Sequence, residues 1–363
     1  MIEPLRRIPL HFSDDSREAG THTNLSAVRT DGRHLWVAGD ETATVERLTA
    51  LGDEHLDGYG EQVSVRLGEL VDLPAPDDEE ADVEGLARSG PWLWAVGSHS
   101  LKRKRVRAGD DDDRARERLA RVVREENRFT LVRLPVDPVT GLPAREVRTD
   151  GQVLTSAVLG GRDDDLVHLL RKDPLIRPFR KIPSKDNGID VEGLAVHHDE
   201  AGDPTLFVGF RGPVLRGWAL LLEIRPVTHP DDPHRLALAE LSAGKAYRLH
   251  LLDLGGLGIR DLCPDGPDLL VLAGPSMGLS GPVRVHRWVG GCATQAADVV
   301  RAEELPVVLD LPHGQGVDHP EGIAVVPAEV DGARDRLLVV LDSPAPQRHV
   351  PGGMLADLWE LPG

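Results

Sequence analysis

A six-residue stretch that recurs along the chain constrains the fold more than any other feature of the sequence. Residues 82–87 and 190–195 both read Asp-Val-Glu-Gly-Leu-Ala, and residues 319–324 read His-Pro-Glu-Gly-Ile-Ala. Weaker copies of the same shape lie at 24–28 and 259–263. A supersecondary unit that recurs at intervals of tens of residues is typical of solenoids, propellers and arrays.

Each copy is predicted to begin a β-hairpin. A short polar turn follows it, and then an apolar run such as 93–97 or 205–209. The copies are too short for a helix, and the runs are rich in valine, leucine and tryptophan, as strands are. The start of the first strand and the end of the second lie at the same edge of an antiparallel pair. The glutamates of the copies and the corners at His99, Arg211 and Asp342 should therefore share one face.

The repeats predict an all-β fold. They extend over almost all of the 363 residues, which favours a single closed domain over 1–363. Four strands per repeat make the blade of a β-propeller, so we predict five clear blades. Residues 150–189 fit the pattern poorly and form either an insertion or a sixth blade. The last repeat is one strand short, and residues 5–12 are predicted to complete it beside 356–361, which removes open edges. Residues 104–126 contain a helix-like segment, interpreted as an insertion at the rim.

The composition argues against several classes of protein. A formal net charge of −18 disfavours non-specific nucleic-acid binding, which needs a basic surface. The sequence has no run of about 20 apolar residues that would cross a membrane, and residues 1–12 lack the apolar core of a signal peptide. Cys263 and Cys292 are the two cysteines, so a cytoplasmic, reduced protein is the simplest interpretation. The sequence also lacks the common P-loop, serine-hydrolase and zinc-protease motifs.

Several of these motifs resemble the bacterial DUF3616 family, which is named for having no assigned function. The resemblance covers most of the chain and rests on the two Asp-Val-Glu-Gly-Leu-Ala copies and on the segments 97–100, 185–188 and 211–218. The segment 211–218 is the most specific of these, and Phe210 beside it replaces a leucine that is commoner in the family. The Asp-x-Glu-Gly start is also similar to that of the esterase-like phytase propellers. The Glu-Gly strand start is similar to that of calcium-dependent lactonase and organophosphatase propellers.

Carboxylates are predicted to gather at one end of the channel, because the first strand of each blade lines the channel of a propeller. We assign the equivalent positions of the five first strands to Ser26, Glu84, Glu192, Asp261 and Glu321. Two like charges about 4 Å apart repel by about 4 kcal/mol at an effective dielectric near 20. Such a ring needs a cation, shared protons or hydrogen-bond donors, and calcium suits it because calcium takes several oxygen ligands in flexible geometry. Alternatively, each glutamate caps backbone N–H groups of a neighbouring blade.

Cationic side chains are predicted at the same face, at His99, Lys102, Arg103, Lys185, Arg211 and Arg216. An arginine in a glycine-rich turn can present its planar fork to a phosphate or a carboxylate. Alternatively, these cations form structural ion pairs with the channel acids. A metal-bridged small anion would suit an acidic ring beside basic corners.

Two functions from different classes follow. The first is a calcium-dependent hydrolase of a phosphoester or another small anionic ester. In that hypothesis Glu84, Glu192, Asp261 and Glu321 hold calcium, Arg211 and Arg216 bind the anion, and His99 is the general acid or base. Lys185 is predicted to belong to the same catalytic group. The second is a noncatalytic propeller that binds a partner protein or a small ligand on the same face, since a fold does not determine a function.

Overall fold

All five copies of the repeated stretch form the first strand of an antiparallel hairpin. The described residues of the computed structural model are 3–39, 42–52, 57–76, 79–149, 151–198, 202–241, 244–294, 296, 298–327 and 335–362. The hairpins pair β2 (Leu25–Asp31) with β3 (His34–Gly39), β6 (Val83–Ser89) with β7 (Trp92–Gly97), β14 (Asp190–His198) with β15 (Pro204–Gly212), β19 (Gly258–Asp265) with β20 (Asp268–Gly274), and β24 (His319–Val326) with β25 (Arg336–Asp342). The predicted hairpins are therefore confirmed.

Two further strands extend each hairpin into a four-stranded antiparallel unit. The third and fourth strands are β4 (Thr44–Ala50) and β5 (Tyr59–Arg66), β10 (Thr130–Pro135) and β13 (Ala157–Gly160), β16 (Trp218–His229) and β18 (Tyr247–Asp253), β21 (Val283–Trp288) and β23 (Val307–Leu311), and β27 (Gly353–Glu360) and β1 (Arg6–His11). The strand pairing thus makes five units. The described part of residues 150–189 forms no sixth unit, because β13 belongs to the second unit.

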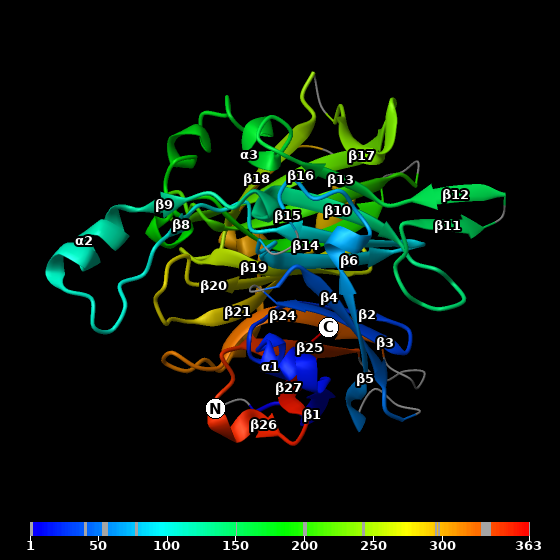
Figure 1. The fold of residues 1–363 in the computed structure, drawn as a ribbon, viewed down its shortest axis with the longest axis horizontal. Coiled ribbons are helices and arrows are strands. Elements are labelled where there is room, and N and C mark those ends of the chain that lie inside the picture. The colour runs from blue at the N-terminus through cyan, green and yellow to red at the C-terminus, as the bar shows by residue number, and fades with distance from the viewer. Residues whose placement is uncertain are drawn as a thin grey trace.

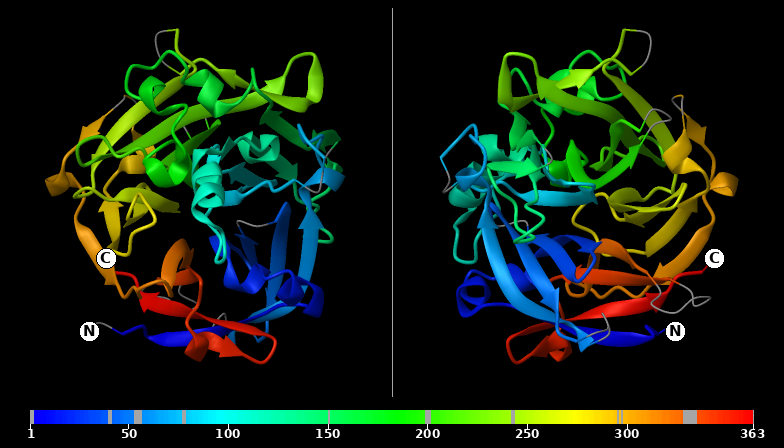
Figure 2. Two further views of the ribbon diagram at one scale, coloured as in Figure 1. Left: turned by 60° about the vertical axis from the view of Figure 1, so that its left-hand side comes forward. Right: turned by 90° about the vertical axis from the view of Figure 1, so that its right-hand side faces the viewer.

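The units lie side by side in a ring, as in a β-propeller (Figures 1 and 2). The first strands contact one another in the order β2, β6, β14, β19 and β24, and β24 contacts β2 again. Apolar side chains fill the spaces between neighbouring units; Trp94 and Phe210, for example, belong to one buried cluster that joins the second and third units.

The two ends of the chain close the ring together. β1 pairs with β27 from Arg6 opposite Leu358 to His11 opposite Gly353, and Leu10 bridges to Tyr59 in the first unit. The blue N-terminal strand lies against the red C-terminal strands in Figure 2. The predicted closure by residues 5–12 is confirmed.

The remaining elements lie outside the four-stranded units. The predicted helical insertion is confirmed as α2 (Asp112–Ala120), which has no buried residue. The other strands are β8 (Lys102–Arg103), β9 (Val122–Val123), β11 (Glu146–Thr149), β12 (Gln152–Thr155), β17 (Asp232–Ala239), β22 (Val299–Val300) and β26 (His349–Val350). The other helices are α1 (Asp14–Glu18), α3 (Leu166–Leu169) and 3-10 turns at Thr21–Thr23, Leu67–Glu69, Glu126–Phe129, Arg177–Phe179, Ser184–Asp186, Gly291–Ala293, Ala302–Glu304 and Pro346–Arg348. Within the described residues, none of the helices has the length and apolar character needed to cross a membrane.

Candidate site at the mouth of the channel

The first strand of every unit carries the same irregularity. One residue near the start of the strand bulges out of register with the second strand, and the bulged residues are Ser26, Glu84, Glu192, Arg260 and Glu321. A β-bulge of this kind re-aims a side chain, and bulges are common next to functional sites. The repeated motif therefore encodes a repeated bulge.

The glycine after each glutamate allows the first strands to approach one another. A Cβ atom at Gly85 would lie 2.9 Å from Cβ of Leu194 in the next unit, and one at Gly322 would lie 3.1 Å from the backbone nitrogen of Val28. Both distances are shorter than side chains tolerate without movement, so the motif needs glycine here. This explains why Glu-Gly recurs as a pair.

In the fourth unit, the prediction that Asp261 is equivalent to Glu84, Glu192 and Glu321 is wrong by one residue. Arg260 occupies the bulge, and Asp261 takes the place that glycine has in Glu-Gly. A shift of one residue turns a strand side chain to the opposite side. Asp261 is fully buried, and its two oxygens accept hydrogen bonds from Arg29 at 2.7 and 2.9 Å. Asp261 therefore does not join the glutamates at the mouth of the channel.

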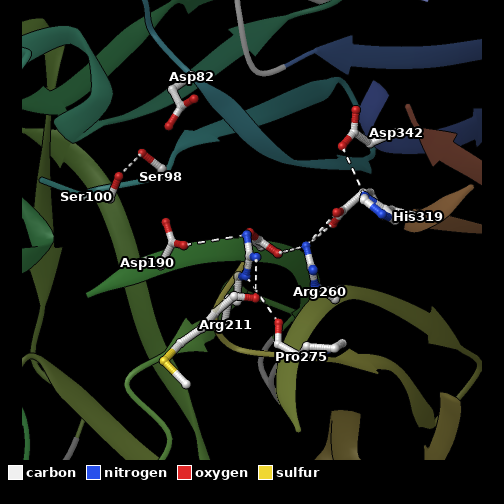
Figure 3. Close-up of polar contacts among 12 residues, drawn as sticks. Asp82, Ser98, Ser100, Asp190, Arg211, Arg260, Pro275, His319 and Asp342 are labelled. Atoms are coloured by element: carbon white, nitrogen blue, oxygen red, sulfur yellow. Dashed lines mark hydrogen bonds and ion pairs between the residues drawn. The ribbon is translucent and has the colours of Figure 1, made fainter. Parts of the chain in front are cut away.

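Arginines link two of the glutamates into a chain of ion pairs (Figure 3). Nη1 of Arg211 donates to Oε1 of Glu192 at 2.6 Å, and Nη1 of Arg260 donates to Oε2 of the same glutamate at 3.1 Å. Arg260 also donates to Oε1 of Glu321 at 2.5 Å. Protein cations thus neutralise much of the predicted carboxylate ring, and one of them, Arg260, is not among the residues predicted from the sequence.

A second group of donor atoms lies at one end of this chain. Nδ1 of His319 is 3.6 Å from Oδ2 of Asp342, and a dashed line marks this pair in Figure 3. One donor atom each from His319, Glu321 and Asp342 all lie within 4.8 Å of one another, and all three side chains are half-buried. Imidazole and carboxylate groups at this separation can hold a divalent metal ion.

A small polar cavity collects most of these groups. Its volume is about 50 Å³, which holds an ion with a water or two but no large substrate. Its lining residues are Asn24, Leu25, Ser26, Glu84, Lys185, Glu192, Arg211, Glu321 and Asp342. We call this cavity the near mouth. Of the predicted site residues, it contains Glu84, Glu192, Glu321, Lys185 and Arg211.

His99 and Arg216, two predicted catalytic residues, are not among those that line the near mouth. His99 is buried with a backbone φ of +50°, its Nδ1 lies 2.8 Å from the carbonyl oxygen of Gly97, and its ring meets Phe129 edge-on. Burial lowers the pKa of His99. Arg216 is exposed after β15, with a φ of +51°. The geometry therefore favours neither as a group that acts at the near mouth.

Burial and neighbouring charges give the carboxyl groups of this region different pKa values. Burial and the negative charge of Glu192 raise the pKa of Glu321 to about 7, although Arg260 acts in the opposite direction. Burial and Glu192 also raise the pKa of Asp190 to about 6. Burial acts the same way on Glu192, but Arg211, Arg260 and Lys185 outweigh it and lower the pKa of Glu192. Glu192 is thus the member of the group that is ionised at neutral pH.

The raised pKa of Glu321 predicts a pH-dependent stability. The folded protein retains a proton that the unfolded chain, with a pKa near 4.5, has lost by neutral pH. The free energy of unfolding should therefore fall as the pH rises from 5 to 8, by up to about 3 kcal/mol at 1.36 kcal/mol per pKa unit. Glu321→Gln, which stays uncharged, should remove most of that fall in urea unfolding curves. Glu303→Gln at an exposed glutamate should not, and an unchanged slope in Glu321→Gln would contradict the assignment.

Comparisons with known proteins concern the family and the fold. A family model described as "Protein of unknown function (DUF3616)" matches residues 24–357. Sequence comparison finds no match among curated proteins. Glutaminyl cyclase from Myxococcus xanthus is a similar solved structure, with 12% identity, coverage of 99% of this chain and 97% of that one, and a TM-score of 0.41. An exo-1,5-alpha-L-arabinanase from a bovine ruminal metagenomic library is another, with 11% identity, coverage of 93% of both chains and a TM-score of 0.37.

Proposed function

The chain belongs to the DUF3616 family, and we propose that it is a metal-dependent hydrolase of a small anionic ester that acts at the near mouth. One observation carries the proposal: His319, Glu321 and Asp342 bring three metal donors within 4.8 Å of one another beside a cavity that Lys185 and Arg211 also line. A divalent cation and a cationic side chain on the same small cavity suit an anion that bridges the two.

The donor set refines the expected metal. Calcium was expected from carboxylates alone, and carboxylates still make up two of the three donors. An imidazole in the set favours a first-row transition metal such as manganese or zinc. When bound, such a cation supplies Lewis-acid chemistry and a water of lowered pKa.

The protein side chains have distinct roles in this proposal. Arg211 is occupied by Glu192, and its Nε and Nη2 lie 3.3 Å from the carbonyl oxygens of Pro275 and Met277. Arg211 therefore orients Glu192 and holds the 275–277 loop rather than offering a free fork to a substrate. Lys185, an exposed side chain of the same cavity, is the group we assign to the substrate anion. Glu192, which stays ionised, keeps both arginines in place.

Metal binding should stabilise the folded protein by mass action. At a metal concentration of 100 times Kd the gain is about 2.7 kcal/mol. We expect manganese or zinc to raise the melting temperature, a chelator to reverse the rise, and His319→Ala to abolish it. His313→Ala, at an exposed histidine nearby in the sequence, is the matched control. Calcium in parallel tests the original expectation, and no response to any of the three ions would overturn the metal site.

Hydrolysis is measured separately, with 4-nitrophenyl phosphate and 4-nitrophenyl acetate as generic substrates. We expect turnover of the phosphate ester that needs the metal and that falls at least tenfold in Lys185→Gln while the melting response to metal remains. Metal binding without turnover of either ester would contradict the hydrolase and leave a metal-binding propeller.

A noncatalytic binding module is the second candidate, and the ion-pair chain favours it. Arg211 and Arg260 neutralise Glu192 and Glu321, and the near mouth has a volume of only about 50 Å³. Buried ion pairs of this kind also occur as purely structural devices. In that case the ion pairs at the near mouth would hold the starts of neighbouring first strands together. Binding of a partner would then survive His319→Ala and Lys185→Gln.

A further inference from the structure

Arg29 blocks the channel between its two ends. Its guanidinium is buried, pairs with Asp261, and donates to the carbonyl oxygens of Ile323 at 2.9 Å and Leu194 at 2.7 Å. It also donates to the carbonyl oxygens of Val28 and Leu262. These carbonyls belong to four different first strands, so the side chain lies across the axis of the ring. The two ends of the channel are therefore separate environments.

A larger cavity lies at the opposite end, where the first strands finish. Its volume is about 490 Å³, within the range of small-molecule sites. We call it the far mouth. Each of the five first strands contributes lining residues from its last part: Arg29 and Thr30, Arg88 and Ser89, Val196 to His198, Cys263 and Pro264, and Ala324 and Val325.

The far mouth has the opposite chemical character to the near mouth. Its nitrogen-bearing side chains are Arg29, Arg88, His197 and His198, and none of its described lining residues is an aspartate or a glutamate. The near mouth, in contrast, is lined by Glu84, Glu192, Glu321 and Asp342. Three of these side chains lie within 4 Å of a carboxylate outside the lining: Arg29 of Asp261, Arg88 of Asp31 and His197 of Glu223. An anionic ligand would therefore bind the donor atoms that these pairs leave over, together with His198.

Arg88 is the side chain best placed to bind such an anion. Its Nε donates to Oδ2 of Asp31 at 2.7 Å, and its Nη1 donates to the carbonyl oxygens of Gly90 and Trp92. These contacts hold the guanidinium plane, and Nη2 takes no part in them. Beside it, Nε2 of His198 and the hydroxyl of Ser89 are 3.2 Å apart. A guanidinium held in place loses little conformational freedom when its remaining nitrogen, Nη2, donates to an oxyanion.

The rest of the far mouth suits the carbon skeleton of a ligand. Val196, Pro264, Pro267 and Val325 present apolar surface. Both cysteines line the cavity too, and burial raises the pKa of each thiol, that of Cys292 to about 12. The thiols are therefore protonated at neutral pH. They form part of the cavity wall and do not act as nucleophiles.

We propose that the far mouth is a second binding site that takes a small organic anion, a phosphate monoester or a carboxylate, with its oxyanion on Arg88 and its carbon skeleton over the apolar wall. This site does not depend on the function proposed for the near mouth, because Arg29 separates the two.

Calorimetric titration of the full chain in the presence of a chelator tests the proposal. The probes are inorganic phosphate, glycerol 3-phosphate and glucose 6-phosphate, with glycerol and glucose as uncharged controls. We expect one equivalent of a phosphorylated probe to bind, and Arg88→Gln to weaken its binding at least tenfold. Arg145→Gln, the same change at an exposed ion-paired arginine, should leave binding unchanged.

Two further variants make the result decisive. His198→Gln, at an exposed position, should also weaken binding and serves if Arg88→Gln does not fold. Arg284→Gln, at an exposed arginine that pairs with Asp310 and lines neither mouth, should leave binding unchanged. Absence of binding at millimolar probe, unchanged affinity in both Arg88→Gln and His198→Gln, or loss of binding in Arg284→Gln would each overturn the proposal.

Discussion

Deletion of residues 1–12 should lower the free energy of unfolding by several kcal/mol and expose an edge that aggregates. The deletion removes β1, whose Ile8 and Leu10 are fully buried. Burial of an aliphatic side chain contributes about 1.5–3 kcal/mol, so these two residues alone account for about 3–6 kcal/mol. β27 would then have an unpaired edge in the fifth unit, and the bridge from Leu10 to Tyr59 in the first unit would be lost.

Urea unfolding and size-exclusion chromatography measure the two effects of this deletion. Deletion of residues 1–4, ahead of the strand, is the matched control and should change the free energy of unfolding by less than about 1 kcal/mol. If the 1–12 deletion unfolds at the same urea concentration as the full chain and remains monodisperse, β1 is not needed to close the ring.

Arg29→Met should destabilise the protein by about 3–5 kcal/mol, the usual cost of leaving one partner of a buried ion pair without the other. Asp261 is fully buried and would lose both hydrogen bonds from the guanidinium. The carbonyl oxygens of Leu194 and Ile323 would lose a donor at the same time. The free energy of unfolding in urea measures the loss.

The double variant Arg29→Met/Asp261→Leu separates the ion pair from simple packing. It removes both buried charges, so it should recover part of the loss caused by Arg29→Met. Arg284→Met, which breaks an exposed pair with Asp310, should cost less than about 1 kcal/mol. A loss below about 1 kcal/mol in Arg29→Met would show that the guanidinium does not hold the first strands together.

The sequence alone was sufficient to predict the fold, because the signals for each hairpin lie close together along the chain. The copies at 82–87, 190–195 and 319–324 each combine a strand start, a turn and an apolar run within about twenty residues, and all three became the predicted hairpins. The missing strand of the last repeat also identified residues 5–12 as its completion. Periodicity and counting of strands need no knowledge of contacts between distant residues.

The sequence was sufficient for only part of the site, because the positions there depend on register. Flanking apolar residues contained a usable signal: Ile259 and Leu262 match Val83 and Leu86, and that match assigns the bulge to Arg260. Because residue 261 is acidic, the prediction placed the channel carboxylate there and did not use the match of the flanking residues. Nothing in the sequence indicated that Asp261 would meet Arg29, which lies 232 residues away.

Tertiary structure decided which charges meet. His99 follows β7, and Arg211 lies near the end of the equivalent strand β15. The His99 ring packs against Phe129, whereas Arg211 reaches Glu192. A sequence gives the order of charged residues along each strand, and only the closed ring determines which of them face one another across the channel. For the same reason, the repeated Glu-Gly motif predicted glutamates at the near mouth, while their arginine partners and the donor group of His319, Glu321 and Asp342 emerged only from the folded chain.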